Sequence, residues 1–324
     1  MVSSIVSSGF IPSSMFTSHQ SKVFDTDVTI GILDARSSGQ KIFRQIENDA
    51  KRFEQKFSRF VPTSELNQIN QKKNLRMKVG PETLALLRSA KKFFRQTEGL
   101  FDPTIVVALT ELGYNKTFRE LQNQPASRAR IKANFKKRIP FTALKINATD
   151  CTVTAPLGLE LDLGGIAKGY WVDQAAQFLN QVSRNFWISA GGDMYLRGHG
   201  EGGVNFEVGI ENPLKPGVNI LKLNLPTRGL GIATSGIVKR RGVSGEIFWH
   251  HIIDPRSGLS VENSILTVTV IASSTVAADI MAKTILILGI RRGLAKINSM
   301  RNCACVIIDR KLRMHISKGL KKFL

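Results

Sequence analysis

The stretch LELDLGGIAKGYWVDQAAQFL (residues 159–179) decides the fold class, because it is expected to change from a strand to a helix within a few residues. The strand is predicted to end at Asp162, and Gly164 and Gly165 then let the backbone approach a ligand. The helix is predicted to carry Lys168 in its first turn, where exposed N–H groups and the ammonium both favour an anion. A tight turn with a solvated Lys168 explains this segment alone equally well.

Strands and helices are expected on both sides of this stretch. Residues 23–33 (VFDTDVTIGIL) alternate and are rich in β-formers, which predicts a strand. Pro81 stands where a first helical residue is favoured, and Gly99 stands where a helix stops. Residues 116–138 are expected to form a loop and a short helix, followed by a hairpin-like pair of strands. The predicted helices cover residues 42–59, 81–99, 166–182 and 275–288.

This order of elements predicts a mixed α/β (α+β) fold with mixed sheets flanked by helices. No internal repeat of fixed period and no linker rich in Pro, Gly or Ser divides the chain. No apolar run approaches the ~20 residues that a membrane span needs. We therefore predict a disordered leader over residues 1–22, a single domain over residues 23–324, no membrane span and a cytoplasmic location.

Basic residues dominate the charge of the chain. There are 46 Lys and Arg residues against 25 Asp and Glu residues, which gives a formal charge of +21. Such a charge attracts phosphates, including those of nucleic acids. The densest basic stretch, residues 116–138, lacks interleaved aromatic residues and matches no known nucleic-acid-binding module. No specific nucleic acid partner is expected, and a basic nucleic-acid-binding protein is a distant alternative.

Two glycine-rich segments could contact a nucleotide. GHGEGG (residues 198–203) matches the G-x-G-x-x-G pattern, but an alternating strand follows it where a dinucleotide site needs a helix, so a hairpin turn is favoured. GLGIATSGIVKRR (residues 229–241) is expected to place Thr234 and Ser235 in a turn, where their hydroxyls can bind a polar ligand. An ordinary turn remains the alternative for this segment.

Two further segments carry groups that suit catalysis or metal binding. HHIIDPRSG (residues 250–258) combines two histidines with an acidic residue and a turn fixed by proline, which favours a general base over a packed core histidine. Asp279 lies early in an apolar helix, VAADIMAKTILILG. A carboxylate there either caps the helix or, because it is surrounded by apolar side chains, needs a partner such as a hard cation.

Taken together and in this order, these segments resemble the FAD:protein FMN transferase family, also called ApbE. The similar blocks cover roughly residues 24–290, and eight collinear blocks are far more specific than any one of them. They read FSRFVPTSELNQIN, TEGLFDPT, LDLGGIAKGYWVD, SAGGD, EVGIENP, ATSG, HHIIDPRSG and ADIMAKTILILG. The resemblance implies an ApbE-like domain that binds FAD and magnesium and transfers FMN to a Ser or Thr hydroxyl of a partner flavoprotein, with release of AMP.

The resemblance also implies roles for individual residues. Gly165 matches a position whose carbonyl binds the metal, and Asp279 matches the metal-binding carboxylate. His251 matches the histidine that activates the acceptor hydroxyl. The residues that match FAD-contacting positions are Phe60, Leu100, Phe101, Asp102, Asp162 and Lys168. The metal ion and Lys168 are then expected to neutralise the pyrophosphate while His251 takes the proton.

Two positions depart from the family pattern. Where the family often has a Thr, four residues after the metal-binding Asp, this chain has Lys283, with Thr284 one position further. A lysine cannot bind a metal as a cation, so either the metal is held more weakly or the ammonium partly replaces it. The family's Met-Gly-Thr motif reads Asp25, Thr26 and Asp27, which removes a methionine from the cofactor. An FAD pyrophosphatase and a non-catalytic flavin binder are therefore alternatives.

Overall fold

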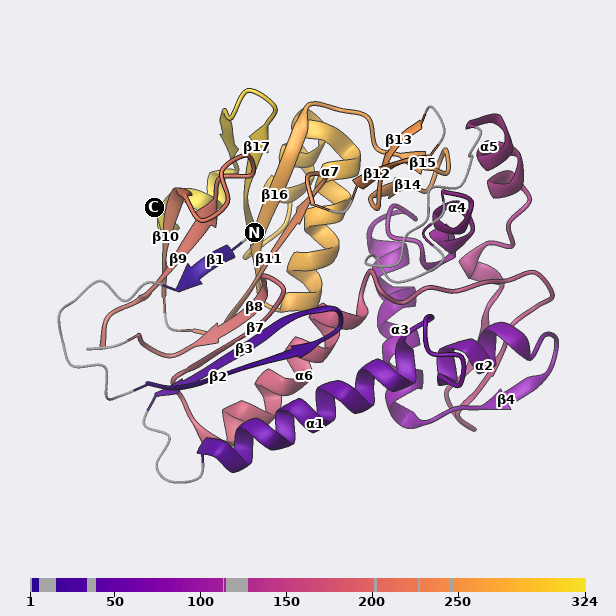
Figure 1. Ribbon diagram of the computed structural model, residues 1–324, viewed down its shortest axis with the longest axis horizontal. Coiled ribbons are helices and arrows are strands. Elements are labelled where there is room, and N and C mark those ends of the chain that lie inside the picture. Colours follow the sequence, from indigo (N-terminus) through magenta and orange to yellow (C-terminus); the bar gives the residue numbers. More distant parts are fainter. Residues whose placement is uncertain are drawn as a thin grey trace. The chain divides into compact units, whose positions relative to one another are not determined.

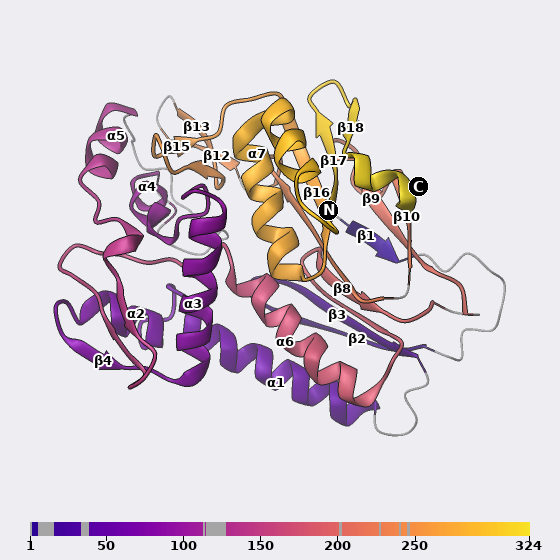
Figure 2. The same ribbon diagram turned by 180° about the vertical axis from the view of Figure 1, so that it is seen from behind.

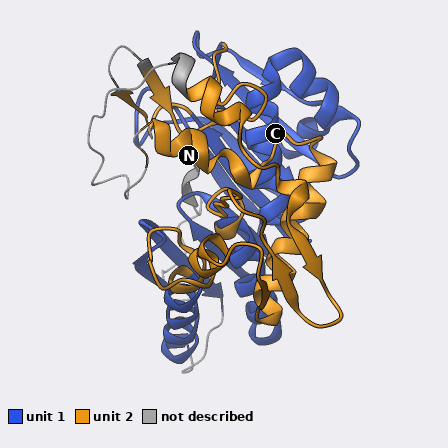
Figure 3. Ribbon diagram, turned by 90° about the vertical axis from the view of Figure 1, so that its right-hand side faces the viewer, with its two compact units in different colours: residues 1–53, 168–236, 264–324 blue, residues 54–167, 237–263 orange. Residues whose placement is uncertain are grey.

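The computed structural model describes residues 2–5, 16–33, 39–112, 114, 128–200, 203–226, 228–239, 241–244 and 247–324. The chain divides into two compact units, coloured separately in Figure 3. Unit 1 contains residues 1–53, 168–236 and 264–324, and unit 2 contains residues 54–167 and 237–263. The predicted α/β fold class is confirmed, because helices accompany several sheets in these units. The single domain over residues 23–324 stays a prediction.

The main feature of unit 1 is an eight-stranded sheet with the order β18-β17-β16-β11-β8-β7-β3-β2 (Figure 1). Neighbouring named strands in it are antiparallel. Short hairpins join β2 to β3, β7 to β8 and β17 to β18, and such hairpins join antiparallel neighbours. Its strands are β2 (Phe16–Val23), β3 (Thr26–Leu33), β7 (Phe186–Ala190), β8 (Asp193–Arg197), β11 (Leu230–Gly236), β16 (Ile265–Ala272), β17 (Ala304–Asp309) and β18 (Met314–Ile316).

Two tight turns shape the β2 side of this sheet. Residues 23–33 do not form one strand, because Phe24 and Asp25 adopt φ angles of 59° and 52° and turn the chain back from β2 into β3. Gly191 and Gly192, with φ angles of 62° and 94°, make the corresponding turn between β7 and β8. Positive φ at both central residues is what a two-residue hairpin turn requires.

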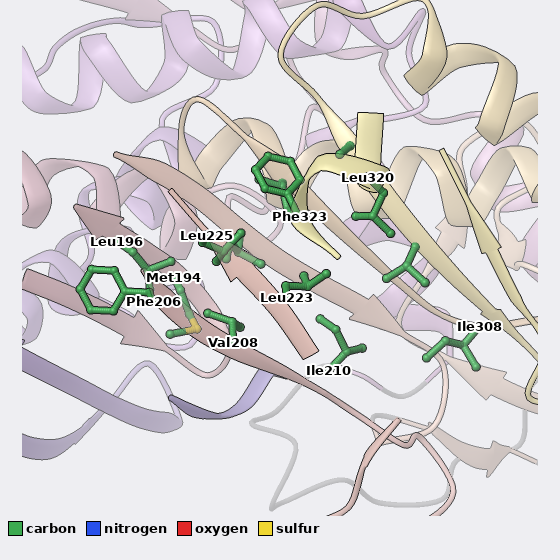
Figure 4. Packing of buried hydrophobic residues seen from close by; sticks show 14 residues of the cluster. Met194, Leu196, Phe206, Val208, Ile210, Leu223, Leu225, Ile308, Leu320 and Phe323 are labelled. Atoms are coloured by element: carbon green, nitrogen blue, oxygen red, sulfur yellow. The ribbon is translucent and has the colours of Figure 1, made fainter. Parts of the chain in front are cut away.

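A second sheet closes the core of unit 1. Strands β1 (Val2–Ile5), β9 (Phe206–Glu211) and β10 (Asn219–Leu225) pair antiparallel, and η5 (Lys318–Phe323) adds Leu320 and Phe323. Figure 4 shows the apolar side chains of β9, β10 and η5 packed with those of β8 and β17. Strand β1 and all but the last residue of β2 lie within residues 1–22, where a disordered leader is predicted, and backbone pairing with β9 and β3 orders these two segments.

Three helices accompany the large sheet, and their apolar faces explain why these segments form helices. Helix α7 (Thr275–Asn298) packs against β11 and β16, as both ribbon views show (Figures 1 and 2). All side chains of β16 are buried, as expected for a strand covered on both faces. Helices α1 (Gly39–Phe57) and α6 (Ala167–Val182) confirm two predicted helices, as does α7. Among the described helices, none is long and apolar enough to span a membrane.

Unit 2 is built from short elements. The predicted helix at Pro81 is confirmed as α3, with Pro81 in its first turn and Gly99 at φ 80° just beyond its end. The predicted short helix is α5, while residues 115–127 lie outside the described residues. The helices are α2 (Glu65–Gln71), α3 (Pro81–Gln96), η1 (Pro103–Ile105), α4 (Val106–Glu111), α5 (Arg128–Lys136) and η3 (Phe141–Ala143). The strands are β4 (Arg76–Lys78), β5 (Lys145–Asn147), β6 (Thr152–Thr154), β12 (Arg241–Ser244), β13 (Ile247–His250), β14 (Ile253–Asp254) and β15 (Leu259–Ser260).

One local prediction around the glycine-rich motifs is wrong. Residues 159–163 form no strand, because side chains take up their backbone groups: the Asn70 amide bonds both the N–H and the carbonyl of Leu161, each at 2.9 Å. In the GHGEGG segment, of which residues 201 and 202 lie outside the described residues, the N–H of Gly203 donates to the carbonyl of Gly200 at 3.2 Å and the N–H of Gly200 to that of Val204 at 2.8 Å, which closes a tight turn. It connects β8 in the large sheet to β9 in the small one.

Candidate functional site

Unit 1 brings two acidic and two basic side chains together. Lys168, in the first turn of α6, donates to Asp193 at the start of β8. Lys283 donates to Asp279 within α7. The carboxylates of Asp193 and Asp279 are almost fully buried, at 3% and 4% exposure of their side chains. We call these four residues the charge cluster.

The electrostatics of Asp279 are those of a group in need of a cation. Burial and the negative charge of Asp193 raise the pKa of Asp279, while Lys283 and Lys168 lower it in part. Lys283 occupies Oδ1, but within the described part of the chain Oδ2 has no hydrogen-bond partner. A buried carboxylate oxygen without a partner is costly unless a ligand or ion satisfies it.

The residues present fit a magnesium ion in one respect. Mg²⁺ is held by one or two carboxylates together with substrate phosphates and water, so the unpartnered oxygen of Asp279 suits it. The described residues contain no group of three or more His, Cys, Asp or Glu that could hold a metal without such additional ligands. Thr284 is not positioned to replace the expected threonine, because its hydroxyl donates to the carbonyl of Ile280 at 2.8 Å.

Thr234 and Ser235 lie in strand β11, which corrects the predicted turn. The segment forms a strand because it pairs on both sides, with β8 and with β16. The Thr234 hydroxyl contacts that of Thr269 across the strands at 2.8 Å. Ser235 is buried and lies on the same face of β11 as Gly231, whose Cα approaches the start of α7 so closely that a Cβ atom there would meet the Thr275 nitrogen at 2.2 Å.

In unit 2, Asp162 lies in a group of charged and aromatic side chains. Its Oδ1 accepts from the N–H of Gly164 at 2.6 Å, and its Oδ2 lies 3.0 Å from Nε of Arg59. The Arg59 guanidinium lies over the ring of Phe60 at 4.3 Å and over that of Tyr114 at 5.1 Å. Cation–π contacts of this kind hold both rings in place. Phe60 and Asp162, predicted to contact FAD, therefore lie close together.

Residues 100–102, which are also predicted to contact FAD, differ in their exposure to solvent. Leu100 is partly exposed, whereas Phe101 and Asp102 are buried at 7% and 5% exposure. A Cβ atom on Gly165 would lie 3.5 Å from the Phe101 ring, so the backbone of Gly165 lies beside that ring. Asp102 accepts from the N–H and hydroxyl of Thr104 and from Arg138. Asp102 therefore caps η1.

The two neighbouring histidines have different environments. The ring of His250 is fixed by backbone groups: Nε2 lies 2.9 Å from the carbonyl oxygen of Val261, and Nδ1 accepts from the N–H of Ile252 at 3.3 Å. His250 is therefore suited to hold the loop rather than to move a proton. His251 follows directly after β13 and is half-buried. Its predicted role as a base stays a prediction.

Some of these residues were not among the predicted site residues. Asp193 belongs to the SAGGD segment, and the turn that precedes it was the signal for it. Arg59 stands next to Phe60, but a basic residue at a helix end carries no distinctive pattern. Asp254, which with Arg256 favoured a functional segment, forms a two-pronged ion pair with Arg256 at 2.9 and 2.7 Å.

Comparisons with known proteins agree on one family. The sequence model described as the ApbE family matches residues 24–307. The FAD:protein FMN transferase of Haemophilus influenzae is 25% identical over 309 residues, which are 93% of this chain and 89% of that protein. The enzyme of the same name from Vibrio cholerae is 28% identical over 301 residues, which are 91% of this chain and 86% of that protein.

Solved structures share the fold. The ApbE protein from Thermotoga maritima is 26% identical and superposes with a TM-score of 0.86, covering 95% of this chain and 99% of that one. The flavin transferase ApbE from Vibrio cholerae is 24% identical, with a TM-score of 0.81 over 95% of this chain and all of that one (100%). The second likeness concerns the fold alone.

Proposed function

Because this chain belongs to the ApbE family, we propose that it is an FAD:protein FMN transferase, the activity for which its curated relatives are named. In this assignment the chain is an enzyme with FAD as a substrate and a flavoprotein as the acceptor. We further assign the acceptor atom to a Ser or Thr hydroxyl, the leaving group to AMP and the metal to Mg²⁺. The cytoplasmic location stays a prediction from the sequence.

The proposed reaction exchanges one phosphorus–oxygen bond for another. The acceptor hydroxyl oxygen bonds to the phosphorus of the FMN half of FAD, and the bond from that phosphorus to the oxygen of the AMP phosphate breaks. AMP leaves with that oxygen and its electron pair, and the hydroxyl proton goes to a base. Negative charge on the pyrophosphate opposes the attack, so the site has to supply positive charge.

The charge cluster of unit 1 is suited to bind the pyrophosphate. The observation that carries the proposal is the unpartnered Oδ2 of buried Asp279 in a cluster that also holds Lys168. Asp279 would hold the metal, which when bound polarises the phosphate oxygens. Lys168 contributes a cation at the start of a helix, where N–H groups also face anions. Asp193 keeps the Lys168 ammonium in place.

In unit 2, His251 is assigned as the base that takes the hydroxyl proton. The aromatic group around Phe60 is assigned to contact the flavin. An imidazole with an ordinary pKa near ~6.5 can accept a hydroxyl proton at neutral pH. Phe60 offers an aromatic face that Arg59 holds in place, and aromatic faces stack well on planar ring systems. Gly165 is assigned as a carbonyl ligand to the metal because it matches the family position that has this role.

The test is direct. The full-length protein is mixed with FAD, MgCl₂ and a panel of purified FMN-binding domains as acceptors, and the acceptors are denatured and examined by fluorescence and mass spectrometry. A covalently attached FMN and stoichiometric AMP are expected. An absence of labelled acceptor across the panel, with FAD bound, would contradict the transferase assignment.

Lys283 favours a second candidate, an FAD pyrophosphatase or a flavin carrier. Its ammonium lies on Oδ1 of the same carboxylate whose Oδ2 would hold the metal, so metal-assisted transfer is opposed by an internal cation. A pyrophosphatase would release free FMN and AMP from FAD without an acceptor. A carrier would bind FAD without turnover, and both outcomes are read in the same assay.

A further inference from the structure

Asp173 of helix α6 faces the first turn of α7. Its Oδ1 accepts from the N–H of Thr275 at 2.7 Å, and its Oδ2 accepts from the N–H of Val276 at 3.0 Å. The first N–H groups of a helix have no partner within the helix, and a carboxylate that binds two of them also complements the helix dipole. Asp173 therefore fixes the start of α7 from a neighbouring helix.

Two further contacts fix the same point. A Cβ atom on Gly169 of α6 would lie 2.9 Å from Cα of Val276, so the two helices touch through their backbones. The hydroxyl of Thr275 donates to the carbonyl of Met194 at 2.9 Å, and Met194 follows Asp193 in β8. The start of α7 is thus joined to the helix and the strand that carry the first half of the charge cluster.

We call these contacts between α6, β8 and the start of α7 the joint. The part of the charge cluster that lies on α7 depends on it. Asp279 and Lys283 lie further along α7, and a helix transmits a displacement of its first turn to the turns that follow. Asp193 and Asp279 also repel each other, as the raised pKa of Asp279 reflects. A site that binds a nucleotide needs its groups held to within about 0.5 Å, so a fixed α7 is a requirement.

We propose that Asp173 is a positioning residue of the nucleotide site. By holding Thr275 and Val276, it keeps Asp279 and Lys283 aligned with Lys168 and Asp193. The statement that the charge cluster binds a nucleotide rests on the proposed function. The contacts between α6 and α7 lie within unit 1 and do not depend on that function.

The joint depends on pH. Burial raises the pKa of Asp173 to about 6, and the hydrogen bonds from Thr275 and Val276 lower it in part. Below that pH the protonated carboxyl makes the joint more stable, whereas above it the ionised carboxylate is held in a site that is poorly hydrated. On β8, Tyr195 and Arg197 are the neighbouring titratable groups. Burial and the charge of Asp173 raise the pKa of Tyr195 from its usual 10, so Tyr195 does not change charge between pH 5 and 8.

Asp173→Asn in the full-length protein tests the proposal, because the amide stays neutral at every pH. Hydrogen exchange is measured at the amides of Thr275 and Val276 at pH 5 and pH 7.5, and FAD affinity is measured by quenching of flavin fluorescence under the same conditions. Because burial raises the pKa of Asp173, for the unaltered protein we expect protection factors and FAD affinity to be about tenfold higher at pH 5 than at pH 7.5. For Asp173→Asn we expect neither quantity to change between the two pH values.

Ser274→Ala is the matched control, because Ser274 caps the same helix with a hydroxyl that accepts from the Ala277 N–H at 3.3 Å and does not titrate. It should lower protection by a similar factor at both pH values and keep the pH dependence. A pH dependence that survives in Asp173→Asn overturns the proposal. If neither protein binds FAD, the proposed function and the role of Asp173 toward the nucleotide both fail, while hydrogen exchange still decides whether the joint exists.

Discussion

Asp102 in unit 2 and Asp279 in unit 1 are both buried aspartates, at 5% and 3% exposure, but their oxygens are used differently. Asp102 has both oxygens bonded, to Thr104 and to Arg138. Asp279 has one oxygen on Lys283 and the other without a hydrogen-bond partner in the described structure. A satisfied buried carboxylate is explained by the fold, whereas an unsatisfied one indicates a missing ligand.

Replacing Asp279 should show the largest effect on activity. For Asp279→Asn we expect FMN transfer to fall by ~10³-fold or more, because the variant loses the charge that would hold the metal. The free energy of unfolding at neutral pH should not fall, because burial raises the pKa of Asp279 and the ionised group therefore costs stability. The measurements are AMP release and urea denaturation. Full activity with lower stability would make Asp279 a structural residue like Asp102.

The two histidines sharpen the same contrast between a reactive and a structural group. His251→Ala should lower FMN transfer by about 10²–10³-fold with little change in FAD affinity, because a general base acts on the attack and not on nucleotide binding. His250→Ala should instead lower the free energy of unfolding by about 1 kcal/mol, because the contact with Val261 is lost. Equal activity of the His251 variant and the unaltered protein would exclude the proposed base.

Asp102→Ala tests the satisfied carboxylate. We expect the free energy of unfolding to fall by about 2–3 kcal/mol, because the Thr104 amide loses its acceptor and Arg138 loses its charged partner. Urea denaturation gives the change in stability, and the KM for FAD gives the effect on the substrate. An unchanged stability with a raised KM would assign Asp102 to FAD, as the family resemblance implies.

Lys283 should show the smallest effect, on metal affinity. Lys283→Thr removes the ammonium from Asp279 and adds an oxygen, so we expect the Kd for Mg²⁺ to fall by about tenfold, measured by calorimetry. Lys283→Arg keeps the positive charge and serves as the control, with an unchanged Kd. A weaker metal affinity in the Thr variant would mean that Lys283 supports the site rather than competes with the ion.

Some parts of the structure could be predicted from the sequence and others could not. Helices α1, α3, α6 and α7 follow from apolar spacing and from Pro81 and Gly99, which are local signals. The segment 159–163 was predicted as a strand because its residues favour one, but Asn70, far away along the chain, binds its backbone instead. The turn predicted at Thr234 is a strand for the related reason that β16, distant in the chain, pairs with it.

The sequence by itself determined the family, the helices and the identity of the groups that can do chemistry, because collinear motifs and apolar periodicity are properties of the chain alone. Only the tertiary structure decided which of those groups are satisfied. Lys168 meets Asp193, Asp173 meets the start of α7, and one oxygen of Asp279 has no partner among the described residues. Hydrogen bonding, burial and Coulomb interactions depend on distances between residues far apart in sequence, and folding alone sets those distances.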